Sequence, residues 1–414
     1  MMGDYLVNPP SSRMRLLVAS VIALIFGMLA WFFGPHAASG PDFGQLWFAA
    51  RDFTAGRNPY LATGPGRAFE WAGALFYPIT AVALVVPFAR LPLYVAMALF
   101  IGLGSGLFAY GLSRDGWARF PVFLSAVALL TAVRGQWSFI LAAAAMIPAL
   151  GFVFAAKPTS SFAAFTYQPS WVALAGSVAL TAALTLVWPG WIASWRDAAA
   201  GAVPIFSPWR PRIFPLGTFP YYAPVSRLDG LGYLLLLAGL RWRRPEARML
   251  FVMALSPVTM VVYEPLLLYL IPRRVGESAL LSLLSWAVWM SPIVLGFPHA
   301  KTDILSQSGD VIVALQYLPA LVMVLQRPNQ GTVPKRIEQF ASRMAAWAPR
   351  RLPGSRARPA FRPLQTSLSG NGSLEKLSTW VAYVRRKPFK AVGFRMSTNP
   401  DRGLRVSDVN IVLL

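Results

Sequence analysis

The sequence predicts an all-α integral membrane protein: a polytopic helical bundle of about eight to ten spans, with an amphipathic helix in its first extracytoplasmic loop. Of its 414 residues, 56% are hydrophobic and only 13% are charged, and the mean hydropathy is +0.51. Soluble domains carry about 25% charged residues, so these charges are too few to cover a water-exposed surface. The composition therefore excludes an ordinary soluble enzyme, a disordered chain and a collagen.

Positive charge is concentrated at the carboxyl end of the chain. The net charge is +22, and the segment from Arg327 to Leu414 holds 17 basic and four acidic residues. This segment is rich in Ser, Pro and Gly and lacks apolar periodicity. We therefore expect two regions: a transmembrane domain over residues 1–330 and a basic, disordered cytoplasmic tail over 331–414.

The same composition limits the partners and cofactors. A pI near 11.1 fits nucleic-acid binding, but the apolar body argues against a nucleic-acid partner, and the cytoplasmic loops of membrane proteins are basic anyway. The chain has no Cys and two His. Disulfides, thiolate catalysis and Cys-bound metals are therefore excluded, and a His-rich metal site is not expected.

The first apolar run extends from Leu16 to Gly34 and follows Arg13 and Arg15. A signal peptide is the alternative, but this run exceeds the 7–15 apolar residues of a typical signal peptide, so we favour an uncleaved helix with a cytoplasmic amino terminus. Further runs lie near 72–89, 93–112, 120–133, 138–156, 170–189, 229–240, 248–271, 277–297 and 308–326. A straight span needs about 20 residues, so the shortest of these runs are expected to be tilted or broken.

The loop after the first run holds the most informative segment, residues 41–60. Phe43, Leu46, Trp47 and Ala50 recur at the spacing of one helical face, which predicts an amphipathic helix on the membrane surface. Asp42 directly precedes this helix. It is either an amino-terminal cap or a functional carboxylate at the membrane–water boundary, and the spacing alone leaves both interpretations open.

An ordered set of short motifs resembles the GT-C glycosyltransferases, and glycosyltransferase family 87 in particular. These are multispanning bacterial enzymes that use polyprenol-phosphate-mannose as donor. The resemblance covers about residues 14–330. Its motifs are the Asp in the first loop, Ala49-Ala50-Arg51, G-x-x-P-Y ending at Tyr60, Phe76-Tyr77-Pro78, Pro87 to Pro92, Arg134-Gly135-Gln136 and Lys157-Pro158.

The resemblance implies a reaction and a set of site residues. Asp42 is the implied general base, which takes the proton of the acceptor hydroxyl while the lipid phosphate leaves. A cation must neutralise that phosphate, and the candidates are Arg51, Arg57, Arg134 and Lys157. Each of these could instead be an interfacial cation whose stem lies along apolar surface. Tyr60, Tyr77, Gln136, Tyr263 and Glu264 complete the expected substrate site.

The resemblance also implies the setting of the reaction. The expected partners are membrane lipid, a polyprenyl-phosphate sugar donor and a lipid or glycan acceptor, in the bacterial inner membrane with both termini cytoplasmic. No cofactor or metal ligand is predicted, and a need for a divalent metal is left open. Two other functions remain: a transporter or flippase, and a catalytically inactive membrane scaffold. A scaffold would leave Asp42 in open solvent, whereas an enzyme would place it in a cavity.

Overall fold

The computed structural model describes residues 10–37, 41–64, 66–70, 73–208, 219–294 and 308–331. These residues belong to the first of two compact units, Met1–Met344 and Ala345–Leu414. All but the first residue of the predicted tail lies outside the described residues.

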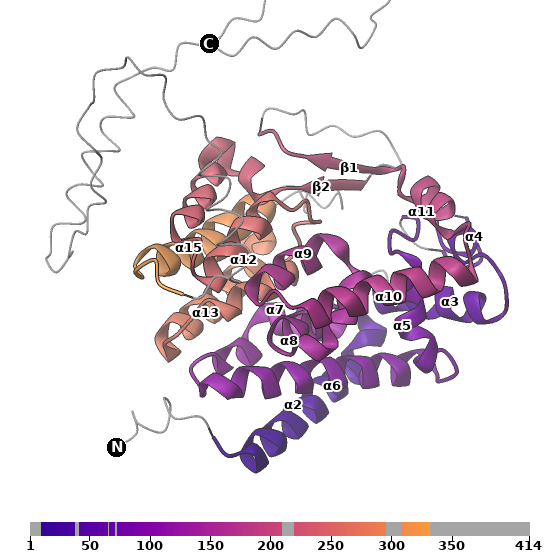
Figure 1. Ribbon diagram of the computed structural model, residues 1–414, viewed down its shortest axis with the longest axis horizontal. Helices are drawn as coiled ribbons and strands as arrows, with labels where there is room; N and C mark the ends of the chain where they lie inside the picture. The colour runs from indigo at the N-terminus through magenta and orange to yellow at the C-terminus, as the bar shows by residue number, and fades with distance from the viewer. Residues whose placement is uncertain are drawn as a thin grey trace, which may run out of the picture. The chain divides into compact units, whose positions relative to one another are not determined.

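The described chain is mostly helical, as predicted (Figure 1). The α-helices are α2 Ser12–Phe33, α3 Phe43–Thr54, α4 Pro59–Ala62, α5 Ile79–Val85, α6 Leu93–Leu112, α7 Ala126–Arg134, α8 Ser138–Met146, α9 Pro158–Tyr167, α10 Trp171–Val187, α11 Trp191–Ala199, α12 Pro245–Leu255, α13 Val275–Val294 and α15 Leu318–Leu325. Short 3-10 segments join them: η1 Gly34–His36, η2 Val86–Phe88, η3 Ser113–Asp115, η4 Phe120–Leu124, η5 Pro148–Ala156, η6 Pro224–Ser226, η7 Leu228–Arg241 and η8 Glu264–Leu270, with a π-helical turn at η9 Val313–Tyr317. Two short parallel strands, β1 Ala202–Ile205 and β2 Phe219–Tyr222, form the one described sheet.

The number of candidate membrane spans is smaller than the eight to ten predicted from the apolar runs. In the described residues, four helical stretches are long and apolar enough to cross a membrane: Ser12–His36, Leu93–Asp115, Val275–Val294 and Ser308–Leu325. The number rises to six if two bent pairs, α7 with α8 and α10 with α11, each form one span. The apolar runs at 120–133, 229–240 and 248–271 form short helices and 3-10 segments, because Pro and Gly interrupt them.

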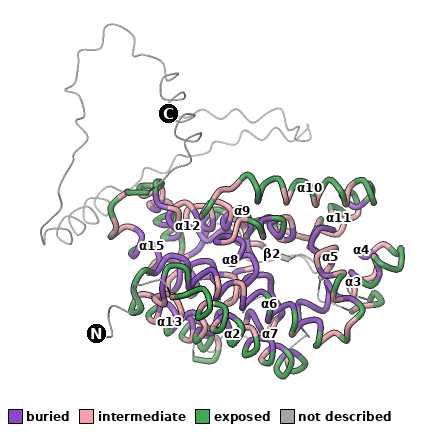
Figure 2. Tube along the Cα trace, turned by 60° about the horizontal axis from the view of Figure 1, so that its bottom comes forward, coloured by how far each residue is buried: buried purple, intermediate pink, exposed green. Residues whose placement is uncertain are grey.

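Among the described helices, α2 and α6 make the most extensive packing contact. Small residues recur every four positions on both: Ala19, Ala23 and Gly27 on α2 and Ala98, Gly102 and Gly106 on α6. A Cβ placed on Gly102 would lie 2.9 Å from the carbonyl oxygen of Ala23. The glycines therefore serve close helix packing, and this small-residue spacing is typical of helix pairs in membranes. The other face of α2 is apolar and exposed (Figure 2).

A sharp bend between α7 and α8 shapes the interior. The two helices meet at 115°, and Gly135 ends α7 in the left-handed conformation with φ of +67°. Its amide donates to Ala132, and the amide of Gln136 donates to Thr131 at 2.9 Å, which is a glycine-capped helix end. A Cβ at Gly135 would lie 2.5 Å from the Cβ of Phe43. Glycine thus lets this turn approach the start of α3.

The charged side chains of the helical body are distributed unequally between its two ends. Arg15 at the start of α2 donates to the carbonyl oxygen of Tyr110 at 2.9 Å, and Arg119 donates to that of Pro272. Arg327 pairs with Glu277 at 2.6 Å. We call this the arginine-rich end; it holds Arg13, Arg15, Arg114, Arg119, Arg241, Arg243, Arg244, Arg248, Arg273, Arg274 and Arg327, with Asp115, Glu246 and Glu277. The opposite end, which contains α3, holds nearly equal numbers of basic and acidic residues among those described.

The α2–α6 interface generates a stability prediction. Gly102→Val should lower the melting temperature of the detergent-solubilised protein markedly, because its side chain must enter the backbone of α2 and overpacking costs about 1–3 kcal/mol. Gly276→Ala is the matched control, since a Cβ there meets nothing within 4 Å. Equal melting temperatures for the two variants would contradict the close contact.

Candidate active site

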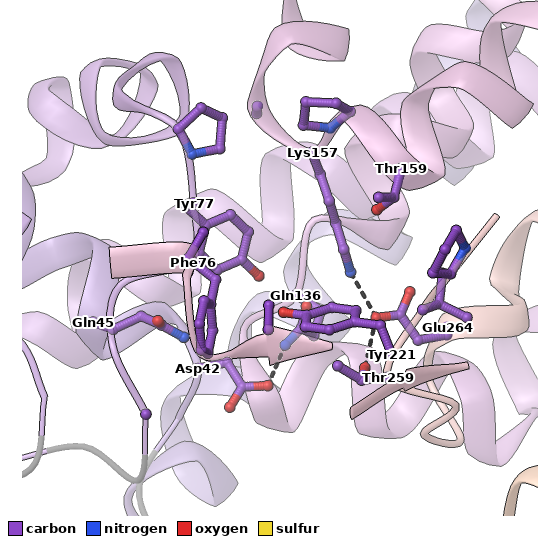
Figure 3. A pocket seen from close by; sticks show the side chains of 18 of the residues that line it. Asp42, Gln45, Phe76, Tyr77, Gln136, Lys157, Thr159, Tyr221, Thr259 and Glu264 are labelled. Atoms are coloured by element: carbon purple, nitrogen blue, oxygen red, sulfur yellow. Dashed lines mark hydrogen bonds and ion pairs between the residues drawn. The ribbon is translucent and has the colours of Figure 1, made fainter. Parts of the chain in front are cut away.

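One cavity of about 390 Å³ lies among α3, η5, α9, the two strands and the irregular stretch before η8. Its wall is largely apolar and aromatic, and its few polar side chains converge on the interior (Figure 3). A concave, mainly apolar cavity with a few placed polar groups is typical of a small-molecule site. The cavity wall includes Asp42, Tyr77, Gln136, Lys157, Tyr263 and Glu264, six of the residues predicted from sequence.

Asp42 lies on the cavity wall, buried to 7% exposure. Its Oδ1 accepts from Arg134 Nη2 at 2.7 Å, and its Oδ2 accepts from the Tyr263 hydroxyl at 2.9 Å and from the Gln136 amide. Within the described chain, the side chain accepts no capping hydrogen bond from α3. Asp42 therefore stands at the cap position of α3, but its carboxylate is directed into a polar cluster and does not cap the helix amides.

Three separate segments of the chain build this cluster. Helix α3 begins at Phe43, whose buried ring packs against Phe100 of α6, and this contact fixes the position of Asp42. The α7–α8 bend presents Arg134 on one side of Gly135 and Gln136 on the other. Tyr263 comes from the irregular stretch after α12, where Ser138 of α8 donates to its carbonyl oxygen at 3.3 Å. Each segment is a break between helices, where side chains can turn inward.

A second ion pair lies in the same cavity. Lys157 Nζ donates to Glu264 Oε1 at 2.7 Å, and the two side chains are 15% and 7% exposed. The Thr259 hydroxyl donates to the same oxygen at 3.2 Å. Lys157 immediately precedes α9, and Thr80 holds the preceding η5 by donating to Ala155 at 2.5 Å. The cavity thus contains two carboxylates, each paired with a cation.

Two tyrosines contact or face these carboxylates. Burial raises the pKa of Tyr77 well above the ordinary tyrosine value, and the charges of Asp42 and Glu264 raise it further. The pKa of Tyr263 is raised by burial and then by the same two carboxylates. Both hydroxyls therefore stay protonated, and each can donate a hydrogen bond within the cavity.

Three predicted site residues lie elsewhere. Arg57 is exposed and donates to Asp52 at 2.8 Å, and Arg51 lies over the ring of Trp47 at 4.6 Å. Tyr60 is buried, and its hydroxyl donates to the carbonyl oxygen of Tyr77 at 3.1 Å. The described cavity wall contains none of the three. The structure thus gives Arg51 and Arg57 the surface role that the sequence left open, and gives Tyr60 a supporting one.

Other cavity residues were not predicted. Gln45 lies one turn after Asp42 on α3, so helical spacing from a predicted residue could have found it. Thr159 lies in the first turn of α9, only two residues after Lys157, and that spacing does not share a helical face. Trp195 of α11 and Tyr221 of β2 cover the cavity from a distant part of the chain. The Trp195 indole donates to the carbonyl oxygen of Phe76 at 2.8 Å. No sequence pattern indicates that contact.

The polar groups of the cavity can bind a hydroxylated and negatively charged molecule. An ionised carboxylate has about four acceptor sites, and three protein donors occupy three of those on Asp42. Gln136 is 3% exposed, and its Oε1 has no hydrogen-bond partner among the described residues. The remaining acceptor site of Asp42 can take a bond from a ligand hydroxyl. No cluster of three metal-ligating side chains occurs in the described part of the chain.

Comparison with known proteins adds no relative. No protein-family profile matches the chain, and neither a curated protein nor a solved structure is significantly similar to it.

The raised tyrosine pKa values predict how stability depends on pH. Unfolded tyrosines lose their protons near pH 10, whereas Tyr77 and Tyr263 keep theirs in the fold. The free energy of unfolding should therefore be insensitive to these groups below about pH 10 and should fall as pH rises above it. Stability in detergent and phenolate absorbance, followed together across this range, check the expectation.

Tyr263→Phe supplies the control, because it should reduce the steepness of that fall. Phenolate absorbance from both tyrosines near pH 10 in the folded protein would contradict their raised pKa values.

Proposed function

We propose that the chain is a polytopic membrane glycosyltransferase that moves a hexose, of the mannose type, from a polyprenyl-phosphate carrier to a lipid or glycan acceptor, with Asp42 as general base. The observation that carries the proposal is the Asp42 carboxylate, which faces a cavity and is held there by Arg134, Gln136 and Tyr263. The ordered motifs that resemble glycosyltransferase family 87 support the same function, since four of them contribute to this cavity.

The proposed reaction uses the arrangement directly. The acceptor hydroxyl binds at the open acceptor site of Asp42 and attacks the anomeric carbon of the donor sugar. As the new carbon–oxygen bond forms, the proton passes to Asp42 and the bond from carbon to phosphate oxygen breaks, so the lipid phosphate leaves with the electron pair and the configuration inverts. Arg134, Gln136 and Tyr263 hold the Asp42 carboxylate in one orientation. The base is therefore already oriented toward the acceptor hydroxyl when the substrate binds.

The orientation in the membrane follows from the charge distribution. Segments rich in Arg face the cytoplasm in membrane proteins, so we place the arginine-rich end inside and α3 with the cavity on the outside. Both termini of the helical body are then cytoplasmic, because α2 begins and α15 finishes at the arginine-rich end. The apolar exposed faces of α2 and α13 suit lipid contact in this position.

One observation favours a transporter as the second candidate. Discontinuous helices that line a midplane cavity are typical of secondary transporters, and the α7–α8 bend lies beside this cavity. A scaffold has less support, since Asp42 faces a cavity and not open solvent. Turnover of a radiolabelled polyprenyl-phosphate sugar separates transfer from transport, because only transfer makes a new glycosidic bond.

The Asp42→Asn variant tests the base. Asn keeps the size of the side chain and can still accept hydrogen bonds, but it cannot take a proton, so transfer should fall about 10²–10⁴-fold, equivalent to roughly 3–5 kcal/mol of barrier. The assay is transfer from the labelled donor in membranes at equal expression.

Asp52→Asn is the matched control. Asp52 lies on the same helix and pairs with Arg57, yet the described cavity wall does not contain it. This variant should transfer at close to the wild-type rate. Wild-type turnover by Asp42→Asn would remove the proposed base, and an equal loss in both variants would indicate damage to α3.

The orientation is tested by single cysteines, because the natural chain has none. A cysteine at Thr54, at the end of α3, should react with an impermeant maleimide added outside intact cells. A cysteine at Arg274, at the arginine-rich end, should react only after the cells are opened. The reverse pattern would invert the topology and place the cavity in the cytoplasm.

A further inference from the structure

Lys157 is unusual in its type and its position. It is the only lysine among the described residues, where every other permanently cationic side chain is an arginine. It lies on the cavity wall at 15% exposure. An ammonium group carries three donors, and in the described structure one of them reaches Glu264. A compact cation with unused donors, facing a cavity, is suited to an oxyanion.

The start of α9 adds further donors beside Lys157. This helix runs from Pro158 to Tyr167, and its cap residue supplies no side-chain hydrogen bond in the described chain. The amides of the first turn of a helix have no partner within the helix and favour negative charge. Thr159, in that turn, lines the cavity, and its hydroxyl has no partner among the described residues.

An anion already lies at this position. Oε1 of Glu264 contacts both Lys157 and the Thr259 hydroxyl, and its other oxygen, Oε2, has no hydrogen-bond partner among the described residues (Figure 3). The carboxylate therefore pairs with the Lys157 ammonium, a donor that an external oxyanion would also need.

We propose that Lys157, Thr159 and the first turn of α9 form a phosphate-binding subsite, and that Glu264 occupies it as an internal competing anion which the phosphate of a ligand displaces. The proposal deepens the proposed function and rests on it, since it assigns the leaving phosphate to this subsite and the acceptor hydroxyl to Asp42. Glu264 is then a specificity-determining residue, because weakly bound anions cannot displace it.

Charge balance explains why a competitor is needed. In the cavity, Asp42 is compensated by Arg134 and Glu264 by Lys157. A phosphodiester adds one negative charge, and two anions cannot share one buried ammonium without repulsion. Binding therefore requires Glu264 to leave Lys157, and only a ligand with further contacts, such as an apolar chain along the aromatic wall, can bring this about.

The test measures binding of two probes, inorganic phosphate and farnesyl phosphate, to the purified full chain in detergent by calorimetry. Glu264→Gln removes the competing charge and should bind farnesyl phosphate about tenfold more tightly than wild type, and it should gain affinity for inorganic phosphate, which wild type should bind only weakly. Lys157→Met should bind farnesyl phosphate at least tenfold more weakly than wild type. The double variant should resemble Lys157→Met, because without the lysine there is no subsite to vacate.

Two further variants control for a general effect of removing a carboxylate and for misfolding of Glu264→Gln. Glu277→Gln is the matched control, since Glu277 also pairs with a cation, Arg327, but at the arginine-rich end, and it should leave probe affinity unchanged. If Glu264→Gln fails to fold, Glu264→Asp withdraws the carboxylate by one methylene and should give a smaller gain in affinity.

Unchanged or weaker binding by folded Glu264→Gln overturns the inference and makes the pair a structural salt bridge. A gain that survives in the double variant overturns it as well. These outcomes differ from failure of the proposed function, which would appear as wild-type transfer by Asp42→Asn with the binding results unaffected.

Discussion

The buried charge of Asp42 is the constraint on which the rest of the structure depends. A carboxylate that leaves water must be paired and hydrogen-bonded, and its three partners come from positions 92, 94 and 221 residues away. The start of α3, the α7–α8 bend and the stretch before η8 must therefore assemble together. Gly135 makes this possible, because only a residue without a Cβ fits against Phe43 in the left-handed conformation.

A polar cavity inside an apolar body also explains why so many helices are broken. In a continuous helix the backbone groups hydrogen-bond to one another, and the side chains point outward or toward neighbouring helices. A break leaves backbone groups without these partners, and within a membrane such groups are tolerated only where they are buried in protein or line a cavity. Polar side chains of the cavity lie at such breaks: Asp42 before α3, Gln136 in the bend and Lys157 between η5 and α9. The interruption within the apolar run 248–271, which removes one candidate span, likewise supplies cavity residues.

The sequence predicted the helical class, the helix after Asp42 and six cavity residues, because these depend on composition, local periodicity and short motifs. It could not fix the number of spans, since an apolar run with Pro or Gly fits a tilted span and a broken one equally well. It could not choose among Arg51, Arg57 and Arg134, because the pairing of Arg134 with Asp42 depends on long-range packing. The sequence did not predict Trp195 and Tyr221 as cavity residues for the same reason.

In the proposed reaction, the two ion pairs of the cavity have separate roles. The proposed base and the proposed anion subsite must keep their own partners, because a lysine that moved to Asp42 would pair with the base and leave the phosphate unpaired. Tyr77 lines the same cavity, and its pKa is raised by burial and then by the charges of Asp42 and Glu264, so its hydroxyl stays neutral near both negative groups. The Tyr263 hydroxyl donates to Asp42, while the chain neighbour of Tyr263 is Glu264. Two consecutive residues thus contact the proposed base and the lysine of the proposed phosphate subsite.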